Sequence, residues 1–232
     1  MDKIAREGFN KAFSEKSYQR FIASIEAEYK GFLDFRIAES PVFIPKELTR
    51  KLIETCEEII TSIKHPDFLK LTERATPADQ NVPNENSHTS FLAIDFAVCQ
   101  TPSGILEPQL IELQGFPSMF GYQDLISSRF QEQYPIPKNF KYLFNSKDSE
   151  EYFQKLEKLI LGNYKKEEVI LLELYPETQK TRIDFEIMRK KLGIKTVCYT
   201  KIIKEGKSLY YLHENQKIQI RRIYNRLIFD EL

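Results

Sequence analysis

The chain has 232 residues with equal numbers of basic and acidic side chains, 34 of each, so its formal net charge is zero. A nucleic-acid-binding protein normally carries a basic excess, and a membrane-spanning helix needs about 18 consecutive apolar residues. The sequence has neither feature, so we expect no nucleic-acid partner and no membrane partner.

The three cysteines, Cys56, Cys99 and Cys198, are far apart, and no two of them have the spacing of a CxxC motif. An odd, scattered set of this kind is typical of reduced thiols in a cytosolic protein. The first residues, MDKIAREGFNKAF, are charged and contain no apolar core of signal-peptide length. These features predict a cytoplasmic protein.

Helices are expected in the first third of the chain. Residues 3–30 combine many charges with apolar residues at helical spacing, and residues 47–64 repeat apolar residues every three or four positions. Pro45 suits the first turn of the second helix. The polar, proline-containing stretch 75–89 predicts a long loop.

Two strands follow. Residues 90–99 and 109–114 are rich in apolar and β-prone side chains, and TPSG between them is a turn signal. The glycine-containing segment GFPSMFGYQD predicts a loop after the second strand, and the proline-containing stretch 134–147 predicts a connector.

The remaining sequence predicts a β-α-β unit. Asp148 with Glu151 resembles a capping box that begins a helix, and Gly162 can end that helix. The next segments are a buried strand, a helix closed by Gly193 and a second strand, and a right-handed crossover would place the two strands side by side. Four strands are expected here: EVILLEL (168–174), KTVCY (195–199), SLYYL (208–212) and KIQIRRIYNRLIF (217–229).

Together these elements predict an α/β fold with two domains. Residues 1–147 would form N-terminal helices with a mixed sheet, and residues 148–232 would form a small parallel-sheet β-α-β domain.

Two acidic residues face each other if the strands at 90–99 and 109–114 form an antiparallel hairpin. A hairpin centred on the TPSG turn pairs Asp95 with Glu112, and Gln114 shares the face of Glu112 because side chains alternate along a strand. Opposed carboxylates repel, so a cation, an arginine or water should offset their charge; Mg²⁺ on nucleotide phosphates uses carboxylates in this way. In a register shifted by one residue, one acid is merely solvated.

Two other segments carry side chains suited to an anionic ligand. The loop GFPSMFGYQ places Ser118 and several backbone N–H groups beyond the acidic strand, where they can cradle an anion, although an ordinary turn has the same spacing. On the last strand, alternation puts Arg222, Tyr224 and Arg226 on one face, where two guanidinium groups could clamp a carboxylate. A solvated basic edge strand gives the same pattern.

The block AIDFAVCQTPSGILEPQLIELQGFPSMFGYQ resembles the eukaryotic-type glutathione synthetases, a circularly permuted branch of the ATP-grasp ligase superfamily. In that family an Asp-bearing strand is followed at the same spacing by an Ile-Glu-x-Asn strand and by a serine-containing loop that ends in Phe-Gly. The likeness continues through the β-α-β unit to IYNR, which matches the family's Val-Tyr-Phe-Arg, and it covers residues 90–232.

The resemblance implies roles for specific residues. Glu112 would be the nucleotide–Mg²⁺ carboxylate, with Gln114 beside it in the family's Asn position, and Asp95 opposite is the second candidate metal ligand. Arg226 would be the catalytic-site arginine that binds the substrate carboxylate. Further substrate contacts would come from two loops: Phe116, Pro117, Ser118 and Met119 in the first, and Gln179, Lys180 and Thr181 in the second.

The chain also departs from the family. Ala93 replaces an arginine that precedes the aspartate, and Leu227 and Ile228 replace a Gly-Tyr pair. The ATP-grasp lysines, the glycine-rich lid and the second metal carboxylate lie later in the family's chain. We therefore expect these 232 residues to be a front half that does not turn over alone, with residues 1–147 pre-ATP-grasp-like and 148–232 substrate-binding.

The resulting hypothesis is the front half of an ATP-dependent carboxylate–amine ligase. It would act through an acyl phosphate on an amino acid or small peptide, with Mg²⁺ and ATP as cofactors, and a homodimer is possible. The alternative is a non-catalytic amino-acid- or peptide-binding module with a ligase-derived fold, which would bind without Mg²⁺ or ATP. A structural or partner-binding role is a third interpretation, since a fold alone does not define a function.

Overall fold

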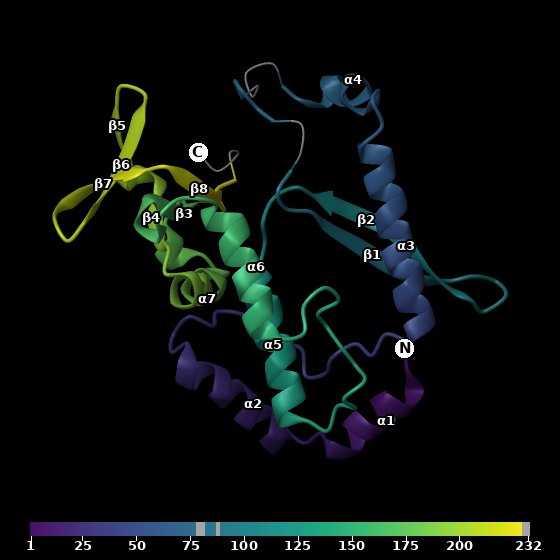
Figure 1. The fold of residues 1–232 in the computed structure, drawn as a ribbon. Helices are drawn as coiled ribbons and strands as arrows, with labels where there is room; N and C mark the ends of the chain where they lie inside the picture. The colour runs from purple at the N-terminus through teal and green to yellow at the C-terminus, as the bar shows by residue number, and fades with distance from the viewer. Residues whose placement is uncertain (78–81, 87–88, 229–232) are drawn as a thin grey trace. The chain divides into compact units, whose positions relative to one another are not determined.

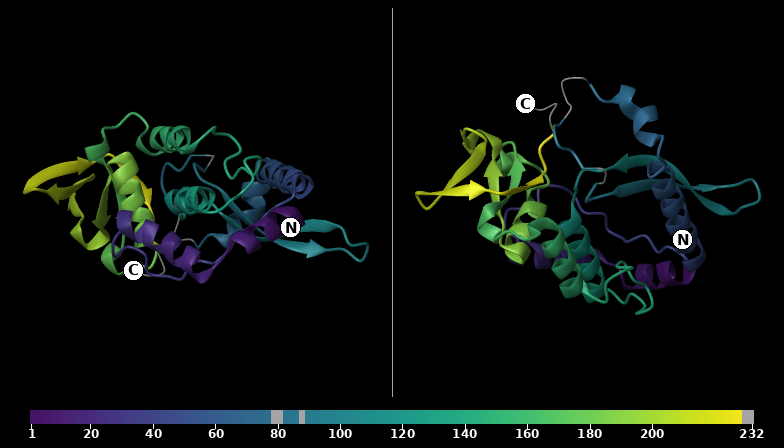
Figure 2. Two further views of the ribbon diagram at one scale, coloured as in Figure 1. Left: turned by 90° about the horizontal axis from the view of Figure 1, so that it is seen from below. Right: turned by 45° about the horizontal axis from the view of Figure 1, so that its top comes forward.

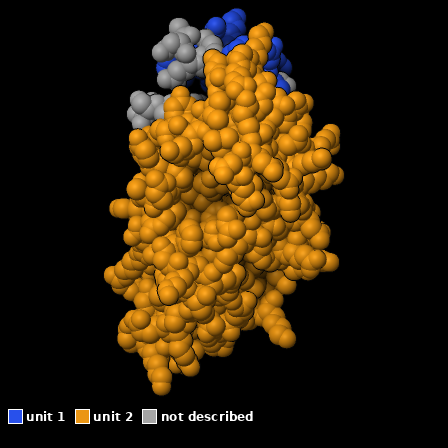
Figure 3. Space-filling view, turned by 90° about the vertical axis from the view of Figure 1, so that its left-hand side faces the viewer, with its two compact units in different colours: residues 1, 44–115 blue, residues 2–43, 116–232 orange. Residues whose placement is uncertain are grey.

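The chain forms two compact units in a computed structural model that describes residues 1–77, 82–86 and 89–228 (Figure 1, with two further views in Figure 2). Unit 1 comprises residue 1 and residues 44–115, and unit 2 comprises residues 2–43 and 116–232 (Figure 3). The predicted domain boundary at residues 147 and 148 falls within unit 2, and a domain division at that point stays a prediction.

Unit 1 is built from a helix and a β-hairpin. Helix α3 (Lys46–Ile63) contacts strand β2, and the Lys51 ammonium donates to the Leu106 carbonyl at 3.3 Å. This confirms the helix predicted at 47–64, although Pro45 is its N-cap residue and not part of its first turn. The unit also contains α4 (Phe68–Thr72), η1 (Glu73–Ala75), β1 (Ala93–Gln100) and β2 (Leu106–Gln114).

The hairpin of unit 1 has the predicted position and direction. Strands β1 and β2 pair antiparallel, and they are joined by a turn in which Gly104 has a φ of +83°. Glycine adopts this left-handed conformation without the steric penalty of a side chain. The loop predicted at 75–89 includes residues 78–81 and 87–88, which lie outside the described residues.

The helical character predicted for residues 3–30 is confirmed, but it is divided between two helices of unit 2. Ser14 begins the second one: its side chain accepts a hydrogen bond from the Ser17 N–H at 3.1 Å, and the Ser17 hydroxyl accepts from the Ser14 N–H at 2.9 Å. Serine favours such caps over a helix interior because its hydroxyl competes for backbone groups. The helices of unit 2 are α1 (Lys3–Ala12), α2 (Glu15–Glu28), α5 (Phe120–Gln133), α6 (Ser149–Leu161) and α7 (Arg182–Leu192).

Aromatic side chains join three of these helices. The rings of Phe9 on α1 and Tyr134 at the end of α5 are 4.7 Å apart, and those of Phe21 on α2 and Phe130 on α5 are 4.5 Å apart. All four are buried. Such ring pairs add about 0.5–1.5 kcal/mol each beyond the burial of their area, so they fix the N-terminal helices to α5.

The helix termini predicted in the second half are confirmed. Asp148 caps α6 by accepting from the Glu151 N–H at 2.9 Å, and Gly162 and Gly193 end α6 and α7 with φ angles of +58° and +74°. Each is a local signal that needs no distant partner.

A parallel sheet of three strands is the centre of the β-α-β unit. Its order is β4 (Lys195–Cys198), β3 (Val169–Glu173) and β8 (Arg222–Asn225), so β3 lies between the other two. Helix α7 connects β3 to β4, which confirms the predicted crossover with its two strands side by side. The α/β fold class is confirmed as well.

The single strand predicted at 217–229 is wrong. It is two strands of different sheets: β7 (Gln216–Ile220) pairs with β6 (Ser208–His213) in an antiparallel sheet that also contains β5 (Ile203–Glu205), whereas β8 pairs with β3. The break falls at Arg221, whose N–H donates to the Glu168 carbonyl at 2.8 Å. Alternating apolar residues look the same in both strands, so the sequence pattern does not reveal the change of partner.

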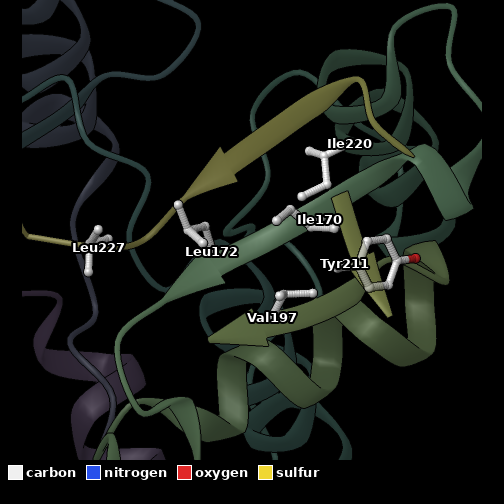
Figure 4. Packing of buried hydrophobic residues seen from close by; sticks show 6 residues of the cluster. All are labelled: Ile170, Leu172, Val197, Tyr211, Ile220 and Leu227. Atoms are coloured by element: carbon white, nitrogen blue, oxygen red, sulfur yellow. The ribbon is translucent and has the colours of Figure 1, made fainter. Parts of the chain in front are cut away.

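The two sheets share a hydrophobic core (Figure 4). Ile170 and Leu172 project from one face of β3, and Val197 joins them from β4. Tyr211 of β6 and Ile220 of β7 close the cluster from the antiparallel sheet. Within the described ranges, no helix is both long and apolar enough to cross a membrane.

Candidate functional site

The β-hairpin of unit 1 carries the predicted acidic pair. Asp95 on β1 lies directly opposite Glu112 on β2, which confirms the register expected from the turn. Immediately afterwards Phe96 pairs with Leu110, so Ile111 is the extra residue of a β-bulge. Bulges bend a strand locally and redirect its side chains, and they are over-represented next to active sites.

Both carboxylates are exposed, and an amide lies beside one of them. The Gln114 side-chain amide donates a hydrogen bond to Glu112 Oε1, which holds that carboxylate in one orientation. Two oxygen-ligand groups suit Mg²⁺, which is commonly bound by one or two carboxylates together with substrate phosphates. The described residues contain no group of three or more His, Cys, Asp or Glu side chains arranged to hold a metal. The metal role of Asp95 and Glu112 stays a prediction.

Arg226 lies in unit 2, just beyond the carboxyl end of β8. Its backbone N–H donates to the Leu172 carbonyl at 2.9 Å, so it continues the pairing with β3. Its side chain is 5% exposed, and its guanidinium lies 5.2 Å from the Phe116 ring centroid and 5.6 Å from that of Phe185. Nη1 donates to the Pro117 carbonyl, whereas the buried Nε has no hydrogen-bond partner among the described residues.

The predicted clamp of two arginines is wrong. The Arg222 guanidinium donates to the Leu159 carbonyl at 2.9 Å, at the C-terminal end of α6, whereas Arg226 donates to the loop at Pro117. The Cα atoms of the two arginines are about 13 Å apart at four residues of extended chain, and each guanidinium is directed to a different segment. The carboxylate-binding role predicted for Arg226 therefore does not include Arg222.

The loop Phe116–Met119 runs into the N-terminus of α5. Met119, the N-cap residue, has a left-handed φ of +56°, and its side chain does not cap the helix. The acceptor for the helix is Asp184 of α7, whose Oδ1 accepts from the Tyr122 N–H at 2.8 Å. A carboxylate from elsewhere in unit 2 thus takes the place of an anion at this helix terminus.

Asp184 is a buried acid that the sequence analysis missed. It is 0% exposed, and Oδ2 has no hydrogen-bond partner among the described residues. Burial raises the pKa of its carboxyl group above 3.8, while the hydrogen bonds from Tyr122 and Gly121 and the charge of Arg226 oppose that shift. The signal in the sequence was an acidic residue on the apolar face of a helix, between Ile183 and Phe185.

This pKa shift predicts a pH dependence of stability. The folded state keeps the Asp184 proton to a higher pH than the unfolded state, so the contribution of Asp184 is fully present below pH 3.8 and is lost as pH rises toward the raised pKa. In that window the free energy of unfolding of the wild type should fall relative to Asp184→Asn by up to about 1.4 kcal/mol per pH unit. Urea unfolding of both proteins across this range checks it, and a constant difference would contradict the shift.

The second predicted substrate loop lies at the same sheet edge as Arg226. The Gln179 side-chain amide donates to the Leu174 carbonyl at 2.9 Å, just after β3, and the Thr181 carbonyl accepts from the Asp184 N–H at 2.9 Å. Lys180 between them is exposed. In open parallel sheets, ligands bind outside the carboxyl ends of the strands where the strand order reverses. The chain continues from β3 to β4 on one side and returns to β8 on the other, so the strand order reverses at β3. These residues and Arg226 therefore lie where a ligand of such a sheet is expected.

The predicted site residues thus fall into two sets. Asp95, Glu112 and Gln114 lie together in unit 1. The loop 116–119 and Arg226 lie together in unit 2, where Gln179, Lys180 and Thr181 follow β3 of the same parallel sheet. The functional role of each set stays a prediction, and the contacts within each set are those given above.

The fold is similar to that of a solved glutathione synthetase-like protein. A solved structure of a glutathione synthetase-like effector from Globodera pallida, in its apo form, matches with a TM-score of 0.54 and 14% sequence identity over 91% of this chain. The chain spans 57% of the length of that protein. No protein-family model matches the sequence, and no curated protein matches it.

Proposed function

We propose that this chain provides the substrate-binding part of an ATP-dependent carboxylate–amine ligase that acts on an amino acid or small peptide. The observation that carries the proposal is the buried guanidinium of Arg226 at the carboxyl edge of the parallel sheet, between two aromatic rings and with Nε unpartnered among the described residues. The likeness in fold to a glutathione synthetase-like effector supports it.

Arg226 would bind the carboxylate of the substrate. A guanidinium presents two parallel N–H donors to a carboxylate, and the low dielectric of a buried position strengthens the attraction. The bond from Nη1 to the Pro117 carbonyl fixes the side chain and joins it to the loop Phe116–Met119. Because the guanidinium is held before the ligand arrives, little conformational entropy is lost on binding.

The acidic hairpin would serve the phosphoryl-transfer step. ATP would phosphorylate the substrate carboxylate, and an amine would then displace phosphate from the acyl phosphate. Asp95 and Glu112 would hold Mg²⁺ for this reaction, and Gln114 would keep Glu112 oriented through its hydrogen bond. The contribution of these residues is charge stabilisation and positioning.

The metal role is tested by Glu112→Ala. We expect this substitution to lower ADP release by the full-length protein, with MgATP and mixed amino acids, at least tenfold, because a hard cation loses one of its carboxylate ligands. Glu107→Ala on the same strand is the control, since Glu107 pairs with Cys99 and lies away from the acidic pair. Equal rates for Glu112→Ala and the wild type would overturn the metal role.

A non-catalytic binding module is the second candidate. The observation that favours it is the hydrogen bond from Gln114 to Glu112, which already occupies one carboxylate oxygen of the acidic pair. Isothermal titration calorimetry with amino acids and small peptides, with and without MgATP, separates the two functions. Binding that does not depend on MgATP, without ADP release, would identify the module, whereas MgATP-dependent binding would support the ligase.

A further inference from the structure

A cavity of about 180 Å³ lies among the helices of unit 2. It is lined by the C-terminal end of α2 and by side chains of α5, α6 and α7. None of its lining residues belongs to the loop 116–119, to residues 179–181 or to Arg226, so it is distinct from the proposed substrate site. Five charged side chains line the cavity, three carboxylates and two cations: Glu28, Asp124, Glu132, Arg129 and Lys191.

One of the carboxylates is buried and has only neutral donors. Asp124 is 5% exposed; Oδ1 accepts from the Tyr142 hydroxyl at 3.1 Å, and Oδ2 accepts from the Ser149 hydroxyl at 2.6 Å. No cation lies within ion-pair distance of Asp124 among the described residues. Each carboxylate oxygen can accept a second hydrogen bond, so Asp124 retains capacity for a charged donor.

The other two carboxylates already share a cation. The Arg129 guanidinium donates to Glu132 at 2.7 Å and also to Glu28, so these three groups of the lining form one ion-pair network. A guanidinium that already donates to two carboxylates leaves little attraction for a further ion. The cavity therefore presents two ionic groups without an ion-pair partner among the described residues, the Asp124 carboxylate and the Lys191 ammonium.

Lys191, an exposed residue, is the second cation of the lining. It projects from the last turn of α7, and its ammonium lies 5.2 Å from the Phe153 ring centroid, with no carboxylate within 4.0 Å among the described residues. An anion-accepting group and a cation-accepting group in one small cavity match the two ends of a zwitterion. Hydroxyl groups of Ser128 and Ser149 in the lining can complete its hydrogen bonds.

We propose that this cavity binds a small α-amino acid, with the ligand's ammonium at Asp124 and its carboxylate at Lys191. The buried carboxylate gains the charged donor that it lacks, and hydrogen bonds between ionised partners are about twice as strong as neutral ones. The size of the cavity restricts the ligand to a small side chain. Because four helices line it, an occupant binds the folded state alone and raises its stability.

The first test uses ligands that carry one or both charges. Isothermal titration calorimetry of the wild-type protein, without ATP or Mg²⁺, compares L-alanine, ethylamine and propionate. We expect L-alanine to bind at least tenfold more tightly than either single-charge compound, since each of those leaves one ionic group of the cavity unmatched. Absence of alanine binding, or equal affinity for alanine and ethylamine, would overturn the proposal.

The second test locates the binding in this cavity. Asp124→Asn keeps the shape of the side chain and removes its charge, so alanine affinity should fall at least tenfold, and Lys191→Gln should lower it about threefold because that ammonium is more exposed. Lys158→Gln, on the exposed face of α6 outside the cavity, is the matched control and should bind as the wild type does. Unchanged affinity in both cavity variants would place the ligand elsewhere and overturn the proposal.

The two tests keep this inference separable from the ligase. Neither uses ATP, Mg²⁺ or ADP release, so an inactive acidic hairpin leaves their outcomes unchanged. If Asp124→Asn fails to fold, Lys191→Gln compared with Lys158→Gln still locates the binding, and an alanine affinity unchanged in Lys191→Gln would then overturn the proposal.

Discussion

Asp184→Ala is expected to lower the free energy of unfolding by about 3 kcal/mol, which is the largest effect of the substitutions considered for this chain. The alanine removes the acceptor of the Tyr122 N–H and leaves a void at a position that is 0% exposed. It also removes the electrostatic attraction between Asp184 and the buried Arg226 guanidinium. Urea-induced unfolding, followed by circular dichroism, measures the change.

Asp184→Asn is the control for this effect. Asparagine retains an oxygen that can accept from the Tyr122 N–H and fills the same volume, so we expect a loss of about 1 kcal/mol or less. A comparable loss for both variants would show that the charge, and not the hydrogen bond to α5, is what matters. A loss below about 1 kcal/mol for Asp184→Ala would contradict the view that this carboxylate holds the start of α5.

Gly121→Ala is expected to lower the free energy of unfolding by about 2 kcal/mol, because the added methyl group overpacks the contact of α5 with α7. A Cβ at this position would lie 2.8 Å from Ile187 Cγ2 and 3.1 Å from Asp184 Oδ1. Both neighbours are buried on α7, so neither can move aside without disturbing the packing of the sheet-covering helix. Thermal and urea unfolding of the variant would measure the loss.

Gly8→Ala is the matched control with the opposite sign. Gly8 lies inside α1, and a Cβ there would meet nothing within 4 Å. Alanine in a helix interior is more stable than glycine by about 0.5–1 kcal/mol, so this substitution should raise the free energy of unfolding. A stabilising effect of Gly121→Ala would contradict the close approach of α5 and α7 at Gly121.

Asp184 and Gly121 belong to one structural feature, the contact between the start of α5 and the first turns of α7. This contact positions the loop Phe116–Met119, because Met119 is the N-cap residue of α5. The same loop supplies the Pro117 carbonyl that accepts from Arg226. Substitutions at Asp184 or Gly121 should therefore also weaken any ligand bound at Arg226, in proportion to the disorder that they introduce.

The sequence alone determined the features that depend on neighbours in the chain. The cap at Asp148, the glycine termini at Gly162 and Gly193 and the alternation that pairs Asp95 with Glu112 are set by backbone geometry over a few residues. The β-α-β order followed as well, because neighbouring parallel strands need a crossover connection, which here is α7. The proposed metal and substrate roles come from the family resemblance, and the buried position of Arg226 supports the substrate role.

The tertiary structure decided what depends on distant partners. The segment 217–229 divides between two sheets because Arg221 bonds to Glu168 and β8 then pairs with β3. Arg226 and Arg222 are held apart because their guanidinium groups donate to different segments, at Pro117 and at Leu159. Arg226 is buried between the rings of Phe116 and Phe185, which are distant from it in the sequence. Asp184 became a helix cap only because α7 packs on α5. Burial and partner choice are set by packing across the fold, and no local pattern in the sequence records them.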